Sequence, residues 1–220
     1  MQRVVIAGGH GQIALHLTRI LHARGISAVG LIRNPDHADD VREAGGEPVV
    51  ADLESAAVEE IASVLRGADA AVFAAGAGPG SGVARKETVD HAASVLMADA
   101  AESAGVRRFI QISSFGAGEP IPDGMDEVFA AYLRAKSAAE ADLVRRDLDW
   151  TIVRPGRLTN NPATGLVRLE EPTMPKGDVT REDVAAVIAA LLPAAGTAHT
   201  VLLLTEGDTA VSDAVARVNH

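Results

Sequence analysis

The sequence predicts an α/β fold in which a parallel sheet of about six or seven strands is covered by helices on both faces. Short apolar runs alternate with stretches of helical periodicity from the first residues onward. Hydrophobic residues make up 47% of the chain and aromatic residues only 3%. The core must therefore consist of aliphatic side chains, which suit buried parallel strands and closely packed helices. The 220 residues fit one domain of this class.

The first half of the chain alternates strands with helices. Residues 3–7 form an apolar run that glycines close, as expected of a buried strand. Apolar positions recur at helical spacing over 12–24, and Gly25 stands where a glycine commonly ends a helix. The same reasoning predicts strands over 26–32, 48–51 and 70–74, and helices over 36–44 and 54–66.

The second half continues this alternation. Thr180 and Asp183 have the spacing of a capping box at the start of a helix over 180–192. Periodicity predicts further helices over 86–103, 127–146 and 211–218, and strands over 109–113, 150–154 and 200–204. Because parallel neighbours need crossover connections, this order predicts a doubly wound sheet.

Three irregular stretches each follow a predicted strand. They cover residues 76–82, 116–124 and 158–177. All three therefore lie at the carboxyl edge of the sheet, where open α/β sheets bind their ligands.

Composition excludes several classes of function. The formal net charge of −10 argues against nucleic acid as a partner. The chain has no cysteine, and its seven histidines form no ligand-spaced pair, so we expect no metal site. We also expect no secretory leader and no membrane span, because the first residues and the longest apolar run are too short for either. We expect a cytoplasmic monomer or homodimer whose partner is a small molecule.

A glycine-rich turn joins the first strand to the first helix, with the spacing Gly8-x-x-Gly11-x-x-Ala14. Gly8 permits a sharp turn, Gly11 lets the backbone approach a pyrophosphate, and Ala14 lets the helix lie close to the sheet. Free N–H groups at the helix start, together with its dipole, favour phosphate. The context of strand, turn and helix predicts a dinucleotide site of the Rossmann type. A purely structural turn is the alternative.

Arg33 ends the second predicted strand, where a site that prefers NAD usually has an acidic residue. A guanidinium can instead meet a 2′-phosphate with two parallel hydrogen bonds. A solvated arginine near Asp36 is the alternative. We therefore expect NADP(H) to be preferred over NAD(H).

Two further segments are expected along the dinucleotide. Asp52 could accept a hydrogen bond from the adenine amino group while Leu53 packs on the ring, although Asp52 could also cap the following helix. Ala74, Ala75 and Gly76 follow the fourth predicted strand and are small enough for the backbone to touch the cofactor.

With these pieces assembled, the chain resembles the short-chain dehydrogenase/reductase superfamily. It is most similar to the atypical branch of compact NAD(P)H-binding proteins, which includes NmrA-like and NAD-dependent epimerase-like members. The matching motifs, beside the glycine-rich turn, are these: Arg33-Asn34-Pro35, Asp52-Leu53, Ser113-Ser114, Tyr132-x-x-x-Lys136, the segment 151–159 and Thr205-Glu206-Gly207.

This resemblance implies a role for each motif. The residues that would wrap the pyrophosphate are Gly9, His10, Gly11, Gln12 and Ile13. The residues that would line the nicotinamide end are Pro155, Gly156 and Leu158. Lys136 would bond the nicotinamide ribose, Ser113 would orient a substrate carbonyl, and Tyr132 would exchange a proton with it.

The chemistry of the last group can be stated from the residues themselves. Lys136 lies one helical turn from Tyr132 on the same helix face. Its ammonium would favour the phenolate, so that the phenol could quench alkoxide character left by hydride transfer. Tyr132 could also be an ordinary packed tyrosine, and Lys136 a ribose ligand only. Strand register decides whether Ser113 or Ser114 faces the site.

The leading functional hypothesis is an NADP(H)-binding oxidoreductase that transfers hydride to a small carbonyl or quinone-like acceptor. We expect one Rossmann domain over 1–220, with a small substrate-side region formed by 116–126 and 156–180. A non-catalytic NADP(H) sensor or regulatory protein is the alternative. An epimerase or isomerase is disfavoured, because so small a region cannot hold a sugar nucleotide.

Overall fold

The computed structural model describes residues 1–78 and 80–220 and contains a nine-stranded main sheet. Its strand order is β11-β8-β10-β6-β5-β4-β1-β2-β3. From β10 to β3 all neighbours are parallel. These parallel strands are β1 (Arg3–Ala7), β2 (Ser27–Ile32), β3 (Glu47–Val50), β4 (Ala70–Phe73), β5 (Arg108–Ile112), β6 (Asp149–Pro155) and β10 (Thr200–Glu206). The predicted α/β class with a doubly wound parallel sheet is confirmed.

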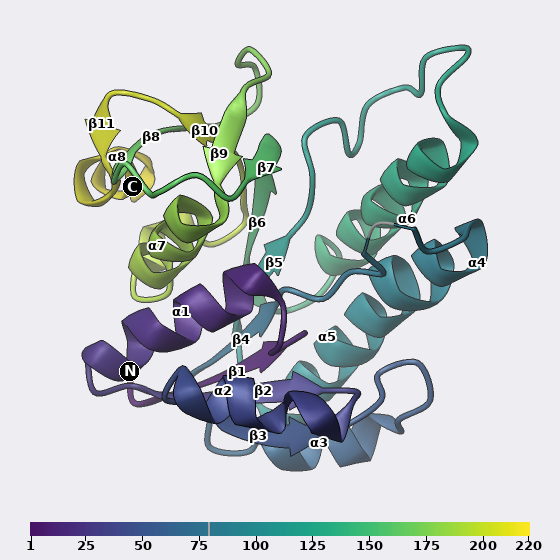
Figure 1. Cartoon of the computed structure of the whole chain (residues 1–220), viewed down its shortest axis with the longest axis vertical. Coiled ribbons are helices and arrows are strands. Elements are labelled where there is room, and N and C mark those ends of the chain that lie inside the picture. The colour runs from purple at the N-terminus through teal and green to yellow at the C-terminus, as the bar shows by residue number, and fades with distance from the viewer. Residues whose placement is uncertain (79) are drawn as a thin grey trace.

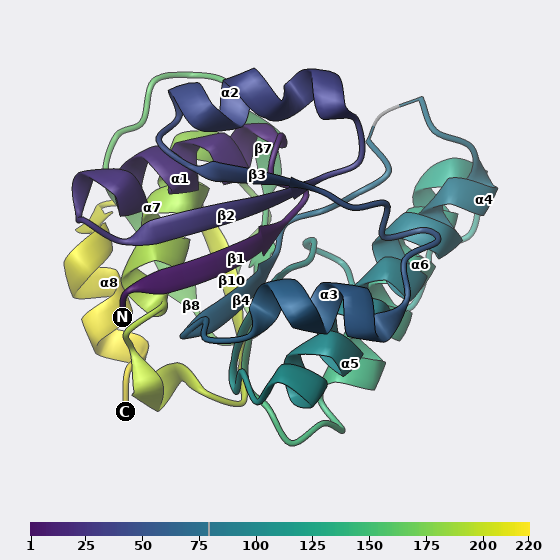
Figure 2. The same ribbon diagram turned by 90° about the horizontal axis from the view of Figure 1, so that it is seen from below.

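Helices cover both faces of this sheet, as the layers in Figures 1 and 2 show. The helices are α1 (Gln12–Ala23), α2 (Ala38–Glu43), α3 (Val58–Leu65), α4 (Val83–Arg85), α5 (Ala93–Ala104), α6 (Glu127–Leu143), α7 (Arg181–Leu191) and α8 (Val211–Val218). Short 3₁₀ turns occupy Pro35–His37 and Ala195–Thr197. Among the described residues no helix is long and apolar enough to cross a membrane.

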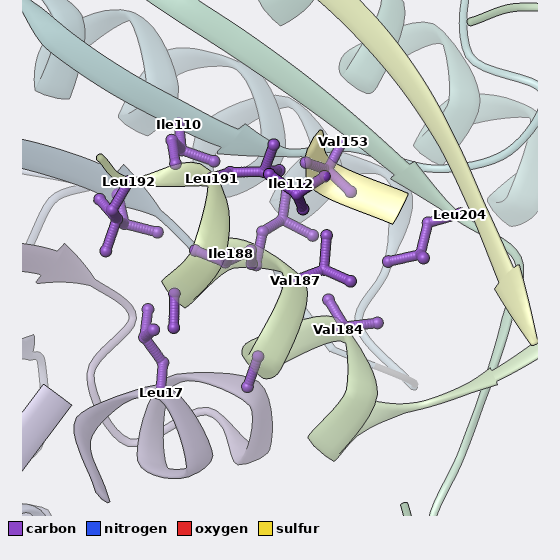
Figure 3. Packing of buried hydrophobic residues seen from close by; sticks show 14 of the residues in the cluster. Leu17, Ile110, Ile112, Val153, Val184, Val187, Ile188, Leu191, Leu192 and Leu204 are labelled. Carbon is purple, nitrogen blue, oxygen red and sulfur yellow. The ribbon is translucent and has the colours of Figure 1, made fainter. Parts of the chain in front are cut away.

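The two layers follow from the alternation of side chains along each strand. In β1, Val4 and Ile6 belong to one buried cluster, which α1, α7 and α8 cover. Val5 and Ala7 belong to the opposite cluster, covered by α3, α5 and α6. Figure 3 shows the first cluster, in which Ile188 of α7 lies among residues of β5, β6 and α1.

Two strands extend the main sheet beyond the prediction. Antiparallel β8 (Leu166–Glu170) pairs with β10, and β11 (Thr209–Ala210) pairs with β8 at the sheet edge. A separate small sheet joins β7 (Arg157–Thr159) to β9 (Asp178–Thr180) in parallel. Strand β8 and most of β7 lie in the stretch 158–177, which we expected to be irregular. Its apolar residues alternate with polar ones over only a few positions, too short a run to separate a strand from a loop.

Thr180 caps α7 as predicted, since its Oγ1 accepts a hydrogen bond from the Asp183 N–H at 2.9 Å. Helix α3, in contrast, begins at Val58 rather than residue 54, and its N-cap is Ala57. The alternative that Asp52 caps this helix is therefore wrong. Its Oδ1 instead accepts from the Glu54 N–H at 3.1 Å, within the turn that precedes the helix.

The long helix predicted over 86–103 has a π-helical first part, Lys86–Ala92, between α4 and α5. One extra residue per turn changes which side chains face inward. Here the buried residues are Lys86, Val89 and Asp90. This segment thus points two charged side chains toward the carboxyl edge of the sheet, where the site lies.

Candidate functional site

Two adjoining cavities open at the carboxyl edge of the parallel strands, on either side of β1 and β4. The first cavity has a volume of about 250 Å³ and lies beside β2 and β3. The second has a volume of about 490 Å³ and lies toward α6. Ala74, Ala75 and Gly76 line both. The cavities therefore form one elongated cleft, at the point where strand order reverses and doubly wound sheets bind ligands.

The glycine-rich turn forms the floor of the first cavity. Gly8 has φ of +76°, and a Cβ placed there would lie 2.7 Å from the Ala75 Cα. Gly11 forms the N-cap of α1 without any side-chain cap, and the first turn of that helix has no acidic residue. The N–H groups at the start of α1 are thus open to an anionic ligand.

Gly9 lies on the side of the turn that faces β2. A Cβ there would be 2.5 Å from the Gly30 Cα, and the Gly9 N–H donates to the Leu31 carbonyl at 2.9 Å. Gly9 is not among the residues that line the first cavity, whereas Gly8, His10 and Gly11 are. The close packing of Gly9 against the backbone of β2 therefore explains why this position requires glycine.

A pair of stacked imidazoles borders the first cavity. The rings of His10 and His37 lie 3.6 Å apart, and His10 Nε2 is 2.7 Å from Asp40 Oδ2. Asn34 lines the cavity next to them. The sequence motifs did not single out His37. Its position in the turn just after Arg33-Asn34-Pro35 was the available signal.

Arg33 lines the first cavity and pairs with Glu54, at 2.8 Å from Oε2, rather than with Asp36. Arg85 reaches the same oxygen at 2.8 Å, and the Thr88 hydroxyl donates to the other at 2.6 Å. The Thr88 hydrogen bond, with Arg85 and Arg33, holds the pKa of the Glu54 carboxyl below its usual value. Glu54 is therefore ionised at neutral pH and balances part of the positive charge.

Asp52 and Leu53 also line the first cavity, at the end of β3. They lie on the same side as Arg33, where the second and third strands end. The predicted adenosine residues are thus brought together at one end of the cleft.

The second cavity contains a buried ion pair. The Lys136 ammonium is 3.3 Å from Asp90 Oδ1 and donates to the Ile112 carbonyl at 3.2 Å. Only 4% of the Lys136 side chain is exposed, and none of Asp90. Asp90 Oδ2 accepts from the Ala77 N–H at 3.2 Å, so this carboxylate also holds the loop after β4.

Two ammonium groups lie near the ring of Tyr132. The Lys86 Nζ is 5.3 Å from the centroid of the tyrosine ring, and the Lys136 Nζ is 5.8 Å from it. Lys86 is buried and donates to the Gly78 carbonyl at 2.9 Å. On the outer side, Phe129 stacks on Tyr132 with a centroid distance of 5.9 Å.

Ser113 is the serine that lines the second cavity. It is 3% exposed, and its Oγ has no hydrogen-bond partner among the described residues. Ser114 instead donates to the Phe115 carbonyl. A buried hydroxyl without a partner is costly, so the Ser113 Oγ is suited to a polar ligand atom.

The remaining predicted residues lie around these cavities. Ile13 and Leu158 line the second cavity. Pro155 and Gly156 are not among its lining residues. Gly156 instead lies against the backbone of Gly177, whose carbonyl oxygen accepts from the Arg157 N–H at 2.9 Å. Gln12 lines a third cavity, of about 400 Å³, on the side of α1 that faces α7.

Sequence reasoning missed Lys86, Asp90 and Arg85. Lys86 and Asp90 fall at helical spacing with the buried residues Ala93 and Met97. Charges on the apolar face of a predicted helix are unusual, and this was the signal that could have found them.

A family model described as NAD(P)H-binding matches residues 8–195. The chain belongs to this NAD(P)H-binding family. The match spans the glycine-rich turn, both cavities and most of the parallel sheet.

Similar proteins cover nearly the whole chain. An uncharacterized sugar epimerase, YhfK of Bacillus subtilis, is 32% identical over 217 residues, which is 98% of this chain and 100% of that protein. The solved structure of a putative NAD-dependent epimerase/dehydratase from Bacillus halodurans is 34% identical, with a TM-score of 0.90 over 99% of this chain and 100% of that one. ChuY, described as an anaerobilin reductase of Escherichia coli, is 26% identical, with a TM-score of 0.80 over 94% of this chain and 98% of that one. These findings confirm the resemblance that the motifs predicted.

Proposed function

We propose that the protein is an NADP(H)-dependent oxidoreductase of the atypical short-chain dehydrogenase/reductase type, which transfers hydride to a small carbonyl or quinone-like acceptor. One observation carries this proposal. The second cavity, which continues the dinucleotide cleft at Ala74–Gly76, is lined by Tyr132, Lys136 and Ser113. A phenol, an ammonium and a hydroxyl in one cavity are the groups that proton transfer to a carbonyl oxygen requires.

The residues of the cleft fit a pyridine dinucleotide. The uncapped start of α1 suits the pyrophosphate, and Gly8 and Gly11 line the cavity beside it. Asp52 and Leu53 suit adenine at one end of the cleft. The unpartnered Ser113 Oγ suits a polar atom at the other end.

The preference for NADP(H) is supported by the charges around Arg33. The guanidinium groups of Arg33 and Arg85 converge on Glu54 at the rim of the first cavity. A 2′-phosphate could bind both in place of that carboxylate, with Asn34 and His37 next to it. An NAD ribose offers hydroxyls only and gains less from this arrangement.

Residues of the second cavity would hold the nicotinamide, and in its reduced form this group would supply the hydride. Ser113 and Tyr132 line the same cavity. Ser113 would donate a hydrogen bond to the acceptor carbonyl, and Tyr132 would give the proton. Asp90 balances the charge of Lys136 and fixes its ammonium, while Lys86 provides a second ammonium beside the phenol ring. Both cations favour a developing phenolate.

We further propose that the chain forms one domain in which residues 116–126 and 156–180 border the acceptor. Asp126 and Leu158 of these segments line the second cavity. At about 490 Å³ this cavity suits a compact acceptor. Two relatives carry epimerase names, but a sugar nucleotide would need more room beside the cofactor.

A non-catalytic NADP(H)-binding regulatory protein is the second candidate. It is favoured by the Asp90–Lys136 pair, because Asp90 offsets the positive charge that would activate Tyr132. In that case the cofactor would bind and no acceptor would be reduced.

One experiment separates the two candidates. A panel of aldehydes, ketones and quinones is offered with NADPH, and oxidation of NADPH is followed by absorbance. We expect turnover with at least one acceptor, and a loss of about a hundred-fold or more in kcat for Tyr132→Phe, with unchanged NADPH affinity. Phe115→Leu, at a residue that lines none of these cavities, is the matched control. NADPH binding without turnover of any acceptor, and indifference to Tyr132→Phe, would favour the regulatory role.

A further inference from the structure

Arg181 lies where two cavities meet. It is the first residue of α7, and it lines both the second cavity and the third. Neighbouring residues of β7 face the two sides, since Leu158 lines the second cavity and Thr159 the third. Arg181 therefore borders the acceptor site proposed above while reaching a polar space beyond it.

The Arg181 guanidinium has donors to spare. Its Nη1 donates to the Asn160 Oδ1 at 2.7 Å, a neutral partner. Among the residues described here Arg181 forms no ion pair. Other arginines do, for example Arg33, Arg154 and Arg168. A guanidinium has five N–H groups in a planar fork that matches a carboxylate.

Helix structure does not explain a cation at this position. Arg181 is at the positive end of the α7 dipole, where acidic side chains are favoured and cations are not. Glu182 and Asp183, the next two residues, follow that rule. Arg181 departs from it without a carboxylate partner to offset the cost, which points to a ligand.

The residues that line the third cavity are a second, independent indication of an anionic ligand. The Thr159 Oγ1 is buried and has no hydrogen-bond partner in the described part of the chain. Thr159 lines the same cavity as His16, Arg19, Asn160 and Arg181, with Glu182 as the one acid among the lining residues. The combination of cations, amides and an unpartnered hydroxyl suits an anionic group.

The charged residues that line the second cavity also favour an anionic ligand. Its cations are Lys86, Lys136 and Arg181, and its acids are Asp90 and Asp126. Lys136 is paired with Asp90, whereas Lys86 and Arg181 each bond a neutral oxygen. Of these two cations, Arg181 has the planar fork that matches a carboxylate. In a chain of net charge −10, a local positive excess of this kind attracts an anion.

The rest of the second cavity is apolar toward its mouth. Val128 and Phe129 line it although they are 38% and 47% exposed, and Phe129 stacks on Tyr132. Exposed large apolar side chains in a cavity wall suit a flat unsaturated ligand.

From these contacts we infer that the acceptor is an apolar, unsaturated carbonyl compound that carries a carboxylate, and that Arg181 binds this carboxylate. The inference rests on the proposed function. In its reduction a C–H bond forms with the hydride of the reduced nicotinamide, and an O–H bond forms with the Tyr132 proton. The carbonyl is reduced, the nicotinamide is oxidised, and Tyr132 regains a proton from water. The carboxylate takes no part in this step and serves for recognition.

The test uses a pair of aldehydes that differ only in charge, 6-formyl-2-naphthoic acid and its methyl ester, with NADPH. We expect the acid to have a KM at least about ten-fold lower than the ester. Arg181→Gln should raise the KM of the acid by about ten-fold or more, with little change in kcat or in the ester. Arg181→Lys, which keeps the charge, should restore part of the difference. Arg217→Gln is the control, since Arg217 also has a neutral partner, Thr209, and lies outside all three cavities.

A binding measurement gives a readout without turnover. With NADP⁺ saturating, calorimetry should detect binding of 6-(hydroxymethyl)-2-naphthoic acid, weaker binding of its methyl ester, and loss of the difference in Arg181→Gln. Equal behaviour of acid and ester in the unmodified protein, or binding of neither, overturns the inference even if neutral quinones are reduced. If NADPH itself does not bind, the proposed function fails first and this inference fails with it.

Discussion

At the scale of single residues, the site depends on charges that are already balanced inside the protein. Glu54 neutralises Arg33 and Arg85, and Asp90 neutralises Lys136. A ligand phosphate must therefore compete with a carboxylate for these cations. Affinity then reflects the difference between two sets of charge-assisted hydrogen bonds, which is smaller than either set alone.

Arg33→Gln tests the role of the guanidinium at the adenosine end. We expect NADPH affinity to fall by about ten-fold or more, because a charged hydrogen bond to the 2′-phosphate is lost. NADH affinity should change by less than about two-fold. Calorimetric titration of both cofactors measures the two effects, and an equal loss for NADH and NADPH would speak against a 2′-phosphate contact.

Glu54→Gln should have the opposite effect on the affinity for NADPH. Removing the competing carboxylate frees Arg33 and Arg85, so NADPH affinity should rise by a few-fold, as measured in the same titration. Stability should respond to pH as well. Because the folded pKa of Glu54 is lowered, its contribution is present above the usual glutamate pKa and is lost as the pH falls through the folded value.

The stability difference between the unmodified protein and Glu54→Gln should accordingly be greatest near neutral pH and shrink in acid. Urea unfolding at several pH values measures it. A difference that grows as the pH is lowered would contradict the assigned pKa direction.

Residues for which a motif fixed both type and position lie together in the structure, while their roles toward a cofactor and a substrate stay predictions. Gly8, Gly11, Arg33 and Asp52 line the first cavity, and Tyr132 and Lys136 line the second. Partners that balance charge were not predicted, because Glu54, Arg85 and Asp90 come from segments distant in sequence from the residues they contact. Their pairing is decided by tertiary structure, which no local pattern encodes.

At the scale of elements, the turn between β1 and α1 shapes the floor of the first cavity. Gly8 is required there for two separate reasons. Its φ of +76° is unfavourable for other residues, and a Cβ would clash with the Ala75 backbone. Gly67 has the same φ of +76° but open space around it, so it provides a control for the conformational effect alone.

We therefore predict that Gly67→Ala costs about 1 kcal/mol of unfolding free energy, from the left-handed conformation. Gly8→Ala should cost at least about 1 kcal/mol more, because backbone must also move. NADPH binding should be weakened by Gly8→Ala and kept by Gly67→Ala. Urea unfolding and calorimetry check both, and equal losses of stability for the two variants would contradict the clash with Ala75.

Elements were predictable in proportion to their length and periodicity. Helix α8 was predicted with its observed bounds, and the parallel strands to within one or two residues. Strand β8 was missed because its five residues alternate only briefly inside a polar stretch. The π-helical segment, which carries the buried Asp90 that pairs with Lys136, was missed because a change in helical register has no distinctive composition.

At the scale of the whole molecule, the cleft binds its ligand across elements from both halves of the sheet. The first cavity is built on β1 to β4, and the second adds residues after β5 and β6 and from α6. A dinucleotide that spans both would hold these parts together. Binding to the folded state alone then adds about 2.7 kcal/mol of stability at a ligand concentration one hundred times Kd.

The central claim is that this cleft grips a pyridine dinucleotide and distinguishes its phosphorylated form. The most direct measurement is calorimetric titration of the purified protein with NADPH and with NADH, accompanied by thermal unfolding in each. We predict saturable heat with NADPH, affinity at least about ten-fold higher than for NADH, and a raised unfolding midpoint. No heat and no stabilisation from either dinucleotide would contradict the account.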